Sequence, residues 1–111
     1  MKAIITQHVE RAGRGEFITD TRVYLADQLQ PLFTVELGFS RTNWTYSCYS
    51  SLFAVIDRLA LDDTIDQLDI SCNFTPFVRE IASGDTRGQL GQILAEKLEA
   101  AGMTITNVKQ L

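Results

Sequence analysis

Several residue types are scarce in this 111-residue chain, which holds one histidine, one tryptophan, two cysteines and two prolines. No apolar run approaches the roughly 20 residues needed to cross a bilayer, and no hydrophobic signal segment opens the chain. We therefore expect a cytoplasmic protein without membrane contact, whose two cysteines are free thiols in a reducing compartment. Structural zinc sites usually show closely spaced cysteine pairs, which are also missing.

An excess of positive charge is also absent. Lys and Arg total 10 against 14 Asp and Glu, which gives a net charge of −4. Proteins that grip a phosphate backbone usually carry a basic stripe, because the release of counterions drives that binding. The composition therefore disfavours nucleic acid as the main partner and favours a protein partner, although a local basic patch can override net charge.

The hydrophobic patterning predicts one domain over residues 1–111. Apolar–polar alternation and β-branched residues predict five strands, over residues 3–9, 17–25, 32–40, 66–72 and 103–108. Between the third and fourth strands the period changes, since Leu52, Val55, Ile56 and Leu59 form one apolar helical stripe. That helix is expected to begin within residues 46–50 and to end before residue 62.

Two shorter helices are expected between the fourth and fifth strands. Thr75 is a suitable N-cap, Pro76 suits the first helical position, and Gly84 is a credible C-cap. A further helix is expected to begin at Asp85 or Thr86 and to end at residue 102. The fold class is therefore α/β (α+β), with three antiparallel strands, a mixed five-stranded sheet and helices packed on it.

This order of elements resembles the ribonuclease H-like fold over nearly the whole chain. The stretch IITQHVERAGRGEF is similar to the family's first strand and glycine-rich turn. LFTVELGFSRTNWTYSCYSSLFAVIDRLAL is similar to its third strand and first helix, and QLDISCNFTPFVREIASG to its fourth strand and the helix that follows. QLGQILAEKLEAAGMTITNV is similar to the segment leading into its fifth strand.

The resemblance also locates the family's catalytic carboxylates. The first-strand aspartate falls at Gln7, the helix glutamate at Cys48, and the second aspartate at Ser71 or Cys72. Two-metal phosphodiester cleavage needs several carboxylates around the ions, and Mg²⁺ strongly prefers carboxylate oxygen. The resemblance therefore implies a degenerate scaffold without nuclease activity, and we expect no catalytic residue, cofactor or metal.

The two cysteines leave a second possibility open. On this fold Cys48 and Cys72 would lie close together, and His8 on the first strand could join them in a metal cluster or in an unrecognised enzyme site. Free cysteines are also commonly buried as small hydrophobic side chains.

An aromatic group stands at the expected start of the long helix. It consists of Arg41, Asn43, Trp44, Tyr46 and Tyr49. Trp, Tyr and Arg are enriched at the energetic centres of protein interfaces, and aromatics beside arginine can also stack on unpaired bases. Packing of one or both tyrosines in the core is the third interpretation.

Two charged segments are further candidates. Asp62, Asp63 and Asp66 form an acidic patch with Asp57, either as a docking surface for a basic partner or as a solvated loop. Residues 11–15 carry two arginines and two glycines, which suits a solvated hairpin turn or a phosphate-binding loop.

The sequence therefore predicts a non-catalytic protein-interaction module: an inhibitor, immunity or accessory factor of bacterial or phage type, which could also associate with itself as a homo-oligomer through an edge strand. The alternatives are a nucleic-acid-binding protein that uses the scaffold groove, and an enzyme that uses Cys48, Cys72 or His8.

Overall fold

The computed structural model describes all residues from 1 to 111 and contains a five-stranded sheet and three helices. The strands are β1 (Lys2–Gly13), β2 (Glu16–Leu25), β3 (Phe33–Phe39), β4 (Gln67–Cys72) and β5 (Thr104–Gln110). The helices are α1 (Trp44–Leu59), α2 (Thr75–Ser83) and α3 (Gln89–Ala101). None of them is both long enough and apolar enough to span a bilayer.

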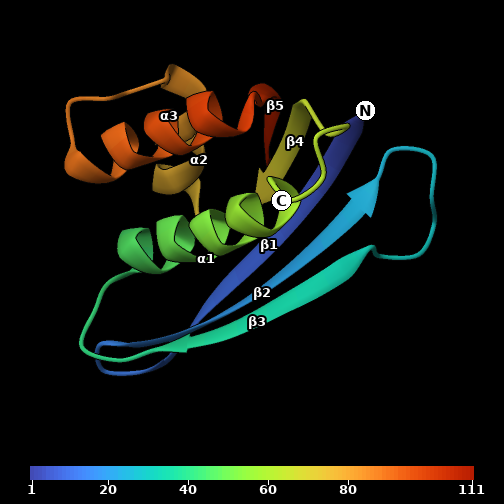
Figure 1. Cartoon of the computed structure of the whole chain (residues 1–111). Helices are drawn as coiled ribbons and strands as arrows, with labels where there is room; N and C mark the ends of the chain where they lie inside the picture. The colour runs from blue at the N-terminus through green and yellow to red at the C-terminus, as the bar shows by residue number, and fades with distance from the viewer.

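The sheet has the order β3-β2-β1-β4-β5 (Figure 1). β1 pairs antiparallel with β2, and β2 with β3, whereas β4 pairs parallel with both β1 and β5. The first hairpin closes tightly because Gly15 adopts the left-handed conformation, with φ +68°. The predicted mixed sheet is confirmed.

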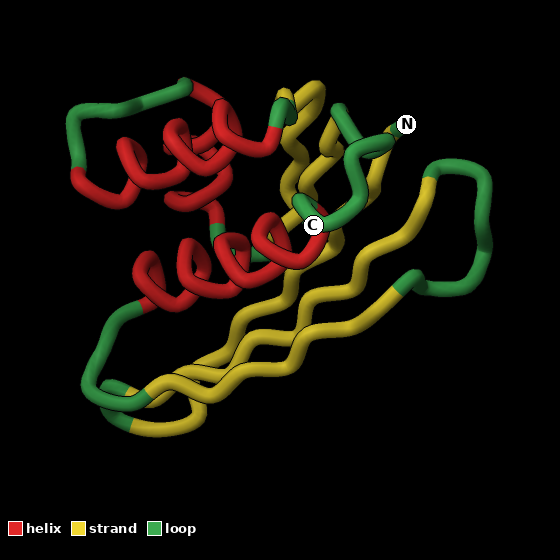
Figure 2. The backbone as a smooth tube through the Cα atoms, viewed as in Figure 1, coloured by secondary structure: helices red, strands yellow, loops and turns green.

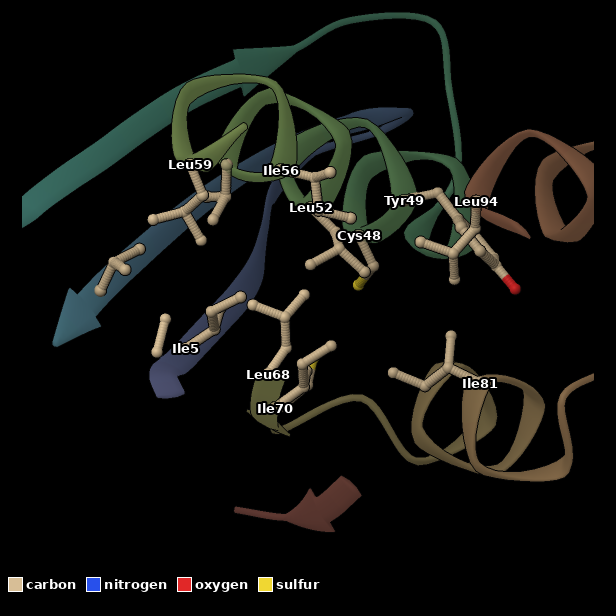
Figure 3. Close-up of a cluster of buried hydrophobic side chains, with 14 of the residues drawn as sticks. Ile5, Cys48, Tyr49, Leu52, Ile56, Leu59, Leu68, Ile70, Ile81 and Leu94 are labelled. Atoms are coloured by element: carbon tan, nitrogen blue, oxygen red, sulfur yellow. The ribbon is translucent and has the colours of Figure 1, made fainter. Parts of the chain in front are cut away.

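The helices lie together over one face of the sheet, as the tube in Figure 2 shows. Strand alternation matches this arrangement, since Ala3, Ile5 and Val9 of β1 are buried while His8 is exposed. Figure 3 shows Ile5 and Leu68 of the sheet pointing toward α1, in one cluster of 19 buried residues. The centre of the sheet under α1 is therefore the core of the domain.

Two helix starts differ from the prediction. Thr75 lies inside α2, whose N-cap is Phe74, whereas Gly84 is the left-handed C-cap that the sequence predicts. α3 begins at Gln89 rather than at Asp85 or Thr86, because the Asp85 carboxylate accepts hydrogen bonds from the backbone and side chain of Arg87 and holds this segment in a turn.

Candidate functional site

Three side chains meet at the centre of the sheet, where the resemblance places catalytic carboxylates. Gln7 of β1 is opposite Cys72 of β4 in the parallel register. The Gln7 amide Nε2 donates a hydrogen bond of 3.0 Å to the backbone carbonyl of Cys48 in the first turns of α1. All three residues are at most 1% exposed, so this centre is closed to solvent.

The two thiols at this centre interact and titrate differently. Hydrogen bonding to Cys72, together with burial, raises the pKa of Cys48. The hydrogen bond from Cys48 lowers the pKa of Cys72, whose Sγ also accepts from the backbone N–H of Phe74 at 3.5 Å. Cys72 is therefore the first of the pair to form a thiolate.

A layer of buried polar side chains surrounds these residues between the sheet and α1. The hydroxyls of Thr19 and Ser51 hydrogen-bond to each other. The Gln7 Oε1 and Thr21 Oγ1 atoms are buried without a hydrogen-bond partner. Polar residues on the inner faces of β1, β2 and α1 thus join the helix to the sheet rather than line a cleft.

The donor atoms at this centre do not fit a pair of Mg²⁺ ions. They are one amide oxygen and two thiols, while Mg²⁺ is held by carboxylate and phosphate oxygens. No group of three or more His, Cys, Asp or Glu side chains gathers anywhere in the chain. The cluster of Cys48 and Cys72 with His8 does not form, because His8 is exposed on the opposite face of the sheet.

Four of the five candidate residues at the start of α1 form a surface. We call it the α1 entry surface, and it consists of Arg41, Asn43, Trp44 and Tyr46. Arg41 is exposed and takes a left-handed conformation, with φ +56°. Asn43 caps the helix, because its Oδ1 accepts from the backbone N–H of Tyr46 at 2.8 Å. Tyr46 is 47% exposed.

The two other aromatics of this group are more enclosed. Trp44 is half-buried and stacks on Phe74, with ring centroids 5.3 Å apart, while Phe17 meets it edge-on at 4.9 Å. Tyr49 is 1% exposed and packs edge-on against Phe77. Its inclusion in a surface patch is therefore wrong, because α1 turns this side chain inward.

The fold adds two arginines to the α1 entry surface. The backbone N–H of Thr42 donates to the carbonyl of Gly15 at 3.1 Å, which holds the β1–β2 hairpin turn beside the start of α1. Arg11 and Arg14 are exposed on or beside this turn, and neither they nor Arg41 makes an ion pair. Residues 11–15 thus form a hairpin turn with a local cluster of unpaired positive charge.

The acidic patch lies beyond the other end of α1. Asp62 accepts hydrogen bonds from the side chain and backbone of Thr64, which lower its pKa. Asp66 pairs with the N-terminal amine at 2.9 Å, which lowers its pKa too, and Asp63 is exposed. Because a helix of 16 residues is about 24 Å long, the patch and the α1 entry surface are separate.

Sequence reasoning misses the role of Asn73, directly after β4. Its side chain accepts from the backbone N–H of Val9 and donates to the carbonyl of Val9, both at 2.8 Å. This pair of bonds ties the end of β4 to β1 beside the buried centre. The only sequence signal is an amide side chain directly after a strand, which is typical of a local turn.

Comparison with known proteins identifies the fold. No family model and no curated protein matches the sequence. The structure is similar to the N-terminal RNase H domain of Rv2228c from Mycobacterium tuberculosis, with TM-score 0.74 and 15% identity over 99% of this chain and 81% of that one. It is also similar to LC11-RNase H1, from a compost metagenome, in complex with an RNA/DNA hybrid (TM-score 0.77, 13% identity, 96% and 83% covered).

A third similar structure is RNase H1 of the halophilic archaeon Halobacterium salinarum, with TM-score 0.67 and 11% identity over 100% of this chain and 84% of that one. The chain therefore adopts an RNase H-like fold, as the order of its elements predicts. At these identities the likeness concerns the fold, and the function has to be argued from the side chains.

Proposed function

We propose that this protein is a non-catalytic protein-interaction module on an RNase H-like scaffold. The observation that carries the proposal is the closed centre formed by Gln7, Cys48 and Cys72. Two-metal hydrolysis needs carboxylates that hold the ions and a space that admits the substrate phosphate. This centre has neither a carboxylate nor an opening.

The acids that lie nearest in sequence, Glu10, Asp69 and Asp57, are directed elsewhere. Glu10 is exposed. Asp69 of β4 is on the opposite face of the sheet, where it accepts a hydrogen bond of 2.6 Å from Thr106 and pairs with Lys2 at 3.5 Å. Asp57 pairs with Lys97 of α3 at 2.7 Å. The carboxylates of Asp69 and Asp57 therefore have structural partners away from the centre.

The α1 entry surface is the contact region that we assign to the partner. Its exposed Tyr46 and half-buried Trp44 offer apolar area on a rigid helix start, and Arg41 adds an unpaired guanidinium. Such residues dominate the binding energy of many interfaces. Self-association through this surface would make the partner a second copy of the chain.

A second candidate function is nucleic-acid binding without cleavage. The cluster of Arg11, Arg14 and Arg41 beside Tyr46 favours it, because unpaired arginines bind phosphates and exposed aromatics stack on bases. The similar LC11-RNase H1 structure contains an RNA/DNA hybrid. The net charge of −4 makes this candidate the weaker one.

The first experiment separates these functions with labelled RNA/DNA hybrid, duplex DNA and single strands, in the presence of Mg²⁺ or Mn²⁺. We expect no cleavage and no binding at near-physiological salt. Binding that weakens steeply with salt, and that Arg14→Ala abolishes while Arg79→Ala does not, would establish the second candidate. Arg79 is an exposed residue of α2 and serves as the control of equal charge. Metal-dependent cleavage would refute the non-catalytic proposal.

The second experiment tests the interaction surface. A photo-crosslinking amino acid at Tyr46 is expected to give a discrete adduct in the native host, and the same probe at Glu36, exposed on β3, is expected to give none. Arg41→Glu should remove the adduct while the circular dichroism spectrum stays unchanged. Equal labelling from both positions would rule out the α1 entry surface as the contact region.

A further inference from the structure

A cavity lies outside both the closed centre and the α1 entry surface. It occupies about 530 Å³ between α2, α3 and β5, and the buried Tyr49 of α1 also lines it. Cavities that hold small molecules usually measure about 300–1,000 Å³. Figure 3 shows the Tyr49 hydroxyl pointing out of the core cluster, past Leu94. With a volume of about 530 Å³, the space is large enough for a small ligand.

One wall of this cavity can form only because a glycine stands at the contact between two segments. Gly91 lies in the first turn of α3, and a Cβ there would be 2.2 Å from the carbonyl oxygen of Asp85. Only glycine lets the segment after α2 lie directly on α3 at this point. The backbone around Asp85 thus forms a fixed rim for the cavity.

The walls are mainly apolar. They include the partly or fully buried side chains of Ile81, Leu94, Leu98, Ile105 and Val108. These residues come from α2, α3 and β5, so the apolar surface surrounds the space from several sides. A ligand that fits it must carry an apolar body to gain from leaving water.

All charged side chains that line the cavity are negative. Its only charged side chains are Glu80 and Asp85. Asp85 is paired with Arg87 at 3.0 Å, and Arg87 points into solvent with 92% of its side chain exposed. Glu80 is half-buried and makes no ion pair with any residue. Glu80 is therefore the carboxylate of the cavity that has no positive partner.

The Tyr49 hydroxyl reinforces this polarity. Burial, the charge of the nearby Glu80 carboxylate and a hydrogen bond between the Tyr49 hydroxyl and Glu80 raise the pKa of Tyr49, so the phenol stays protonated at physiological pH. The phenol gives the cavity a neutral polar group beside the carboxylate. An anionic ligand would meet two carboxylates there and no cation within the walls.

We propose that this cavity binds a small organic cation, with an ammonium group at Glu80 and an aromatic or aliphatic body between Leu94 and Ile105. Charge complementarity selects the cation, because the half-buried Glu80 carboxylate pairs with no cationic side chain and has only the neutral Tyr49 hydroxyl beside it. The apolar walls exclude small, fully hydrated ions such as Na⁺, which have nothing to gain there. This inference is independent of the proposed interaction surface.

The test uses 2-phenylethylamine and two analogues of similar shape, neutral 2-phenylethanol and anionic 3-phenylpropanoate. Amide NMR titrations of the full chain follow residues on the cavity rim and walls, such as Asp85, Leu94 and Ile105. We expect the amine to bind with a Kd on the order of 1 mM, as suits a ligand of about nine heavy atoms. The two analogues should bind at least about fivefold more weakly.

Variants separate the charge from the cavity. Glu80→Gln should weaken the amine about fivefold and leave 2-phenylethanol unchanged, whereas Glu96→Gln, on the exposed side of α3, should change neither. Ala95→Phe introduces a ring into the cavity wall and should abolish binding of all three probes. The amide spectra report directly whether each variant is folded. Equal binding of amine and alcohol, an unchanged amine affinity in Glu80→Gln, or no shifts at about 10 mM amine would overturn the proposal.

Discussion

Two spaces beneath the helices are packed in opposite ways. Under α1 the side chains of Ile70, Cys72 and Gln7 are at most 1% exposed, and polar groups are buried even where they lack partners. Between α2, α3 and β5, Ile105 and Val108 are only half-buried and border a cavity of about 530 Å³. Because both regions belong to one fold, the backbone fold alone does not decide which region is open to a ligand. The side chains that fill each space decide it.

The largest expected effect comes from returning a carboxylate to the closed centre. Gln7→Asp places an unpaired charge among buried residues and should cost about 3–5 kcal/mol of unfolding free energy near neutral pH. Burial raises the pKa of the new carboxyl above its unfolded value of about 3.9, so the folded state binds more protons. Stability should therefore fall as pH rises above that value, which urea unfolding at several pH values measures.

A matched variant and a metal titration test whether the loss of stability comes from the buried charge. Gln7→Met has a similar size and, unlike Gln7→Asp, no charge. It removes the hydrogen bond to the Cys48 carbonyl and should cost only about 1 kcal/mol, because the side-chain oxygen of Gln7 already lacks a partner. If Gln7→Asp were as stable as the original chain, or were stabilised by Mg²⁺, the centre would be an open metal-binding site instead of a core.

A pair of truncations measures the difference in packing directly. Ile70→Ala, in the closed centre, should lower the unfolding free energy by about 2–5 kcal/mol, because it leaves a cavity among buried neighbours. Ile105→Ala, beside the existing cavity, should cost about 1 kcal/mol, since it removes half-exposed surface. Equal losses in urea unfolding would erase the distinction between the two spaces.

A smaller effect is expected where α1 begins. Asn43→Ala removes the side-chain acceptor for the backbone N–H of Tyr46 and should cost about 1 kcal/mol. Asn43→Asp retains the acceptor and should recover most of this loss, as unfolding midpoints would record. A loss that Asn43→Asp does not recover would contradict the capping role.

The smallest effect concerns the order in which the thiols react. Because the folded state lowers the pKa of Cys72 and raises that of Cys48, Cys72 should be the first of the two to be alkylated in the folded protein, and both should react slowly because they are buried. Mass spectrometry of partly labelled protein, with Cys72→Ser and Cys48→Ser as references, measures this order. Rapid alkylation of both thiols in the folded protein would show that the centre is accessible.

The fold was largely readable from periodicity and turn residues. The alternation in β3 and the helical stripe of Leu52, Val55, Ile56 and Leu59 place the sheet and α1 correctly. Helix starts are less predictable, because the Asp85 turn and the Asn43 cap depend on local polar contacts. The order of elements also brings Gln7, Cys48 and Cys72 together, as the resemblance requires.

Features built from several elements could not be read in this way. Tyr46 and Tyr49 lie three residues apart at the start of α1, and the packing of this helix on the sheet buries Tyr49 and leaves Tyr46 exposed. The turn that carries Arg14 and the segment that carries Arg41 meet through the hydrogen bond from Thr42 to Gly15, which joins two parts of the chain that are distant in sequence. The cavity has no sequence signature at all, because three elements leave it unfilled.

The most direct test of the closed centre is a titration of the isotope-labelled protein with Mn²⁺, whose unpaired electrons broaden the NMR signals of nearby nuclei. The backbone amides of Gln7, Cys48 and Cys72 should keep their intensity at Mn²⁺ concentrations that saturate ordinary two-metal nuclease sites. Any broadening should be confined to exposed carboxylates such as Asp62 and Asp63. Selective loss of the Gln7 and Cys72 signals would show that metal enters the centre, and it would contradict this account of the protein.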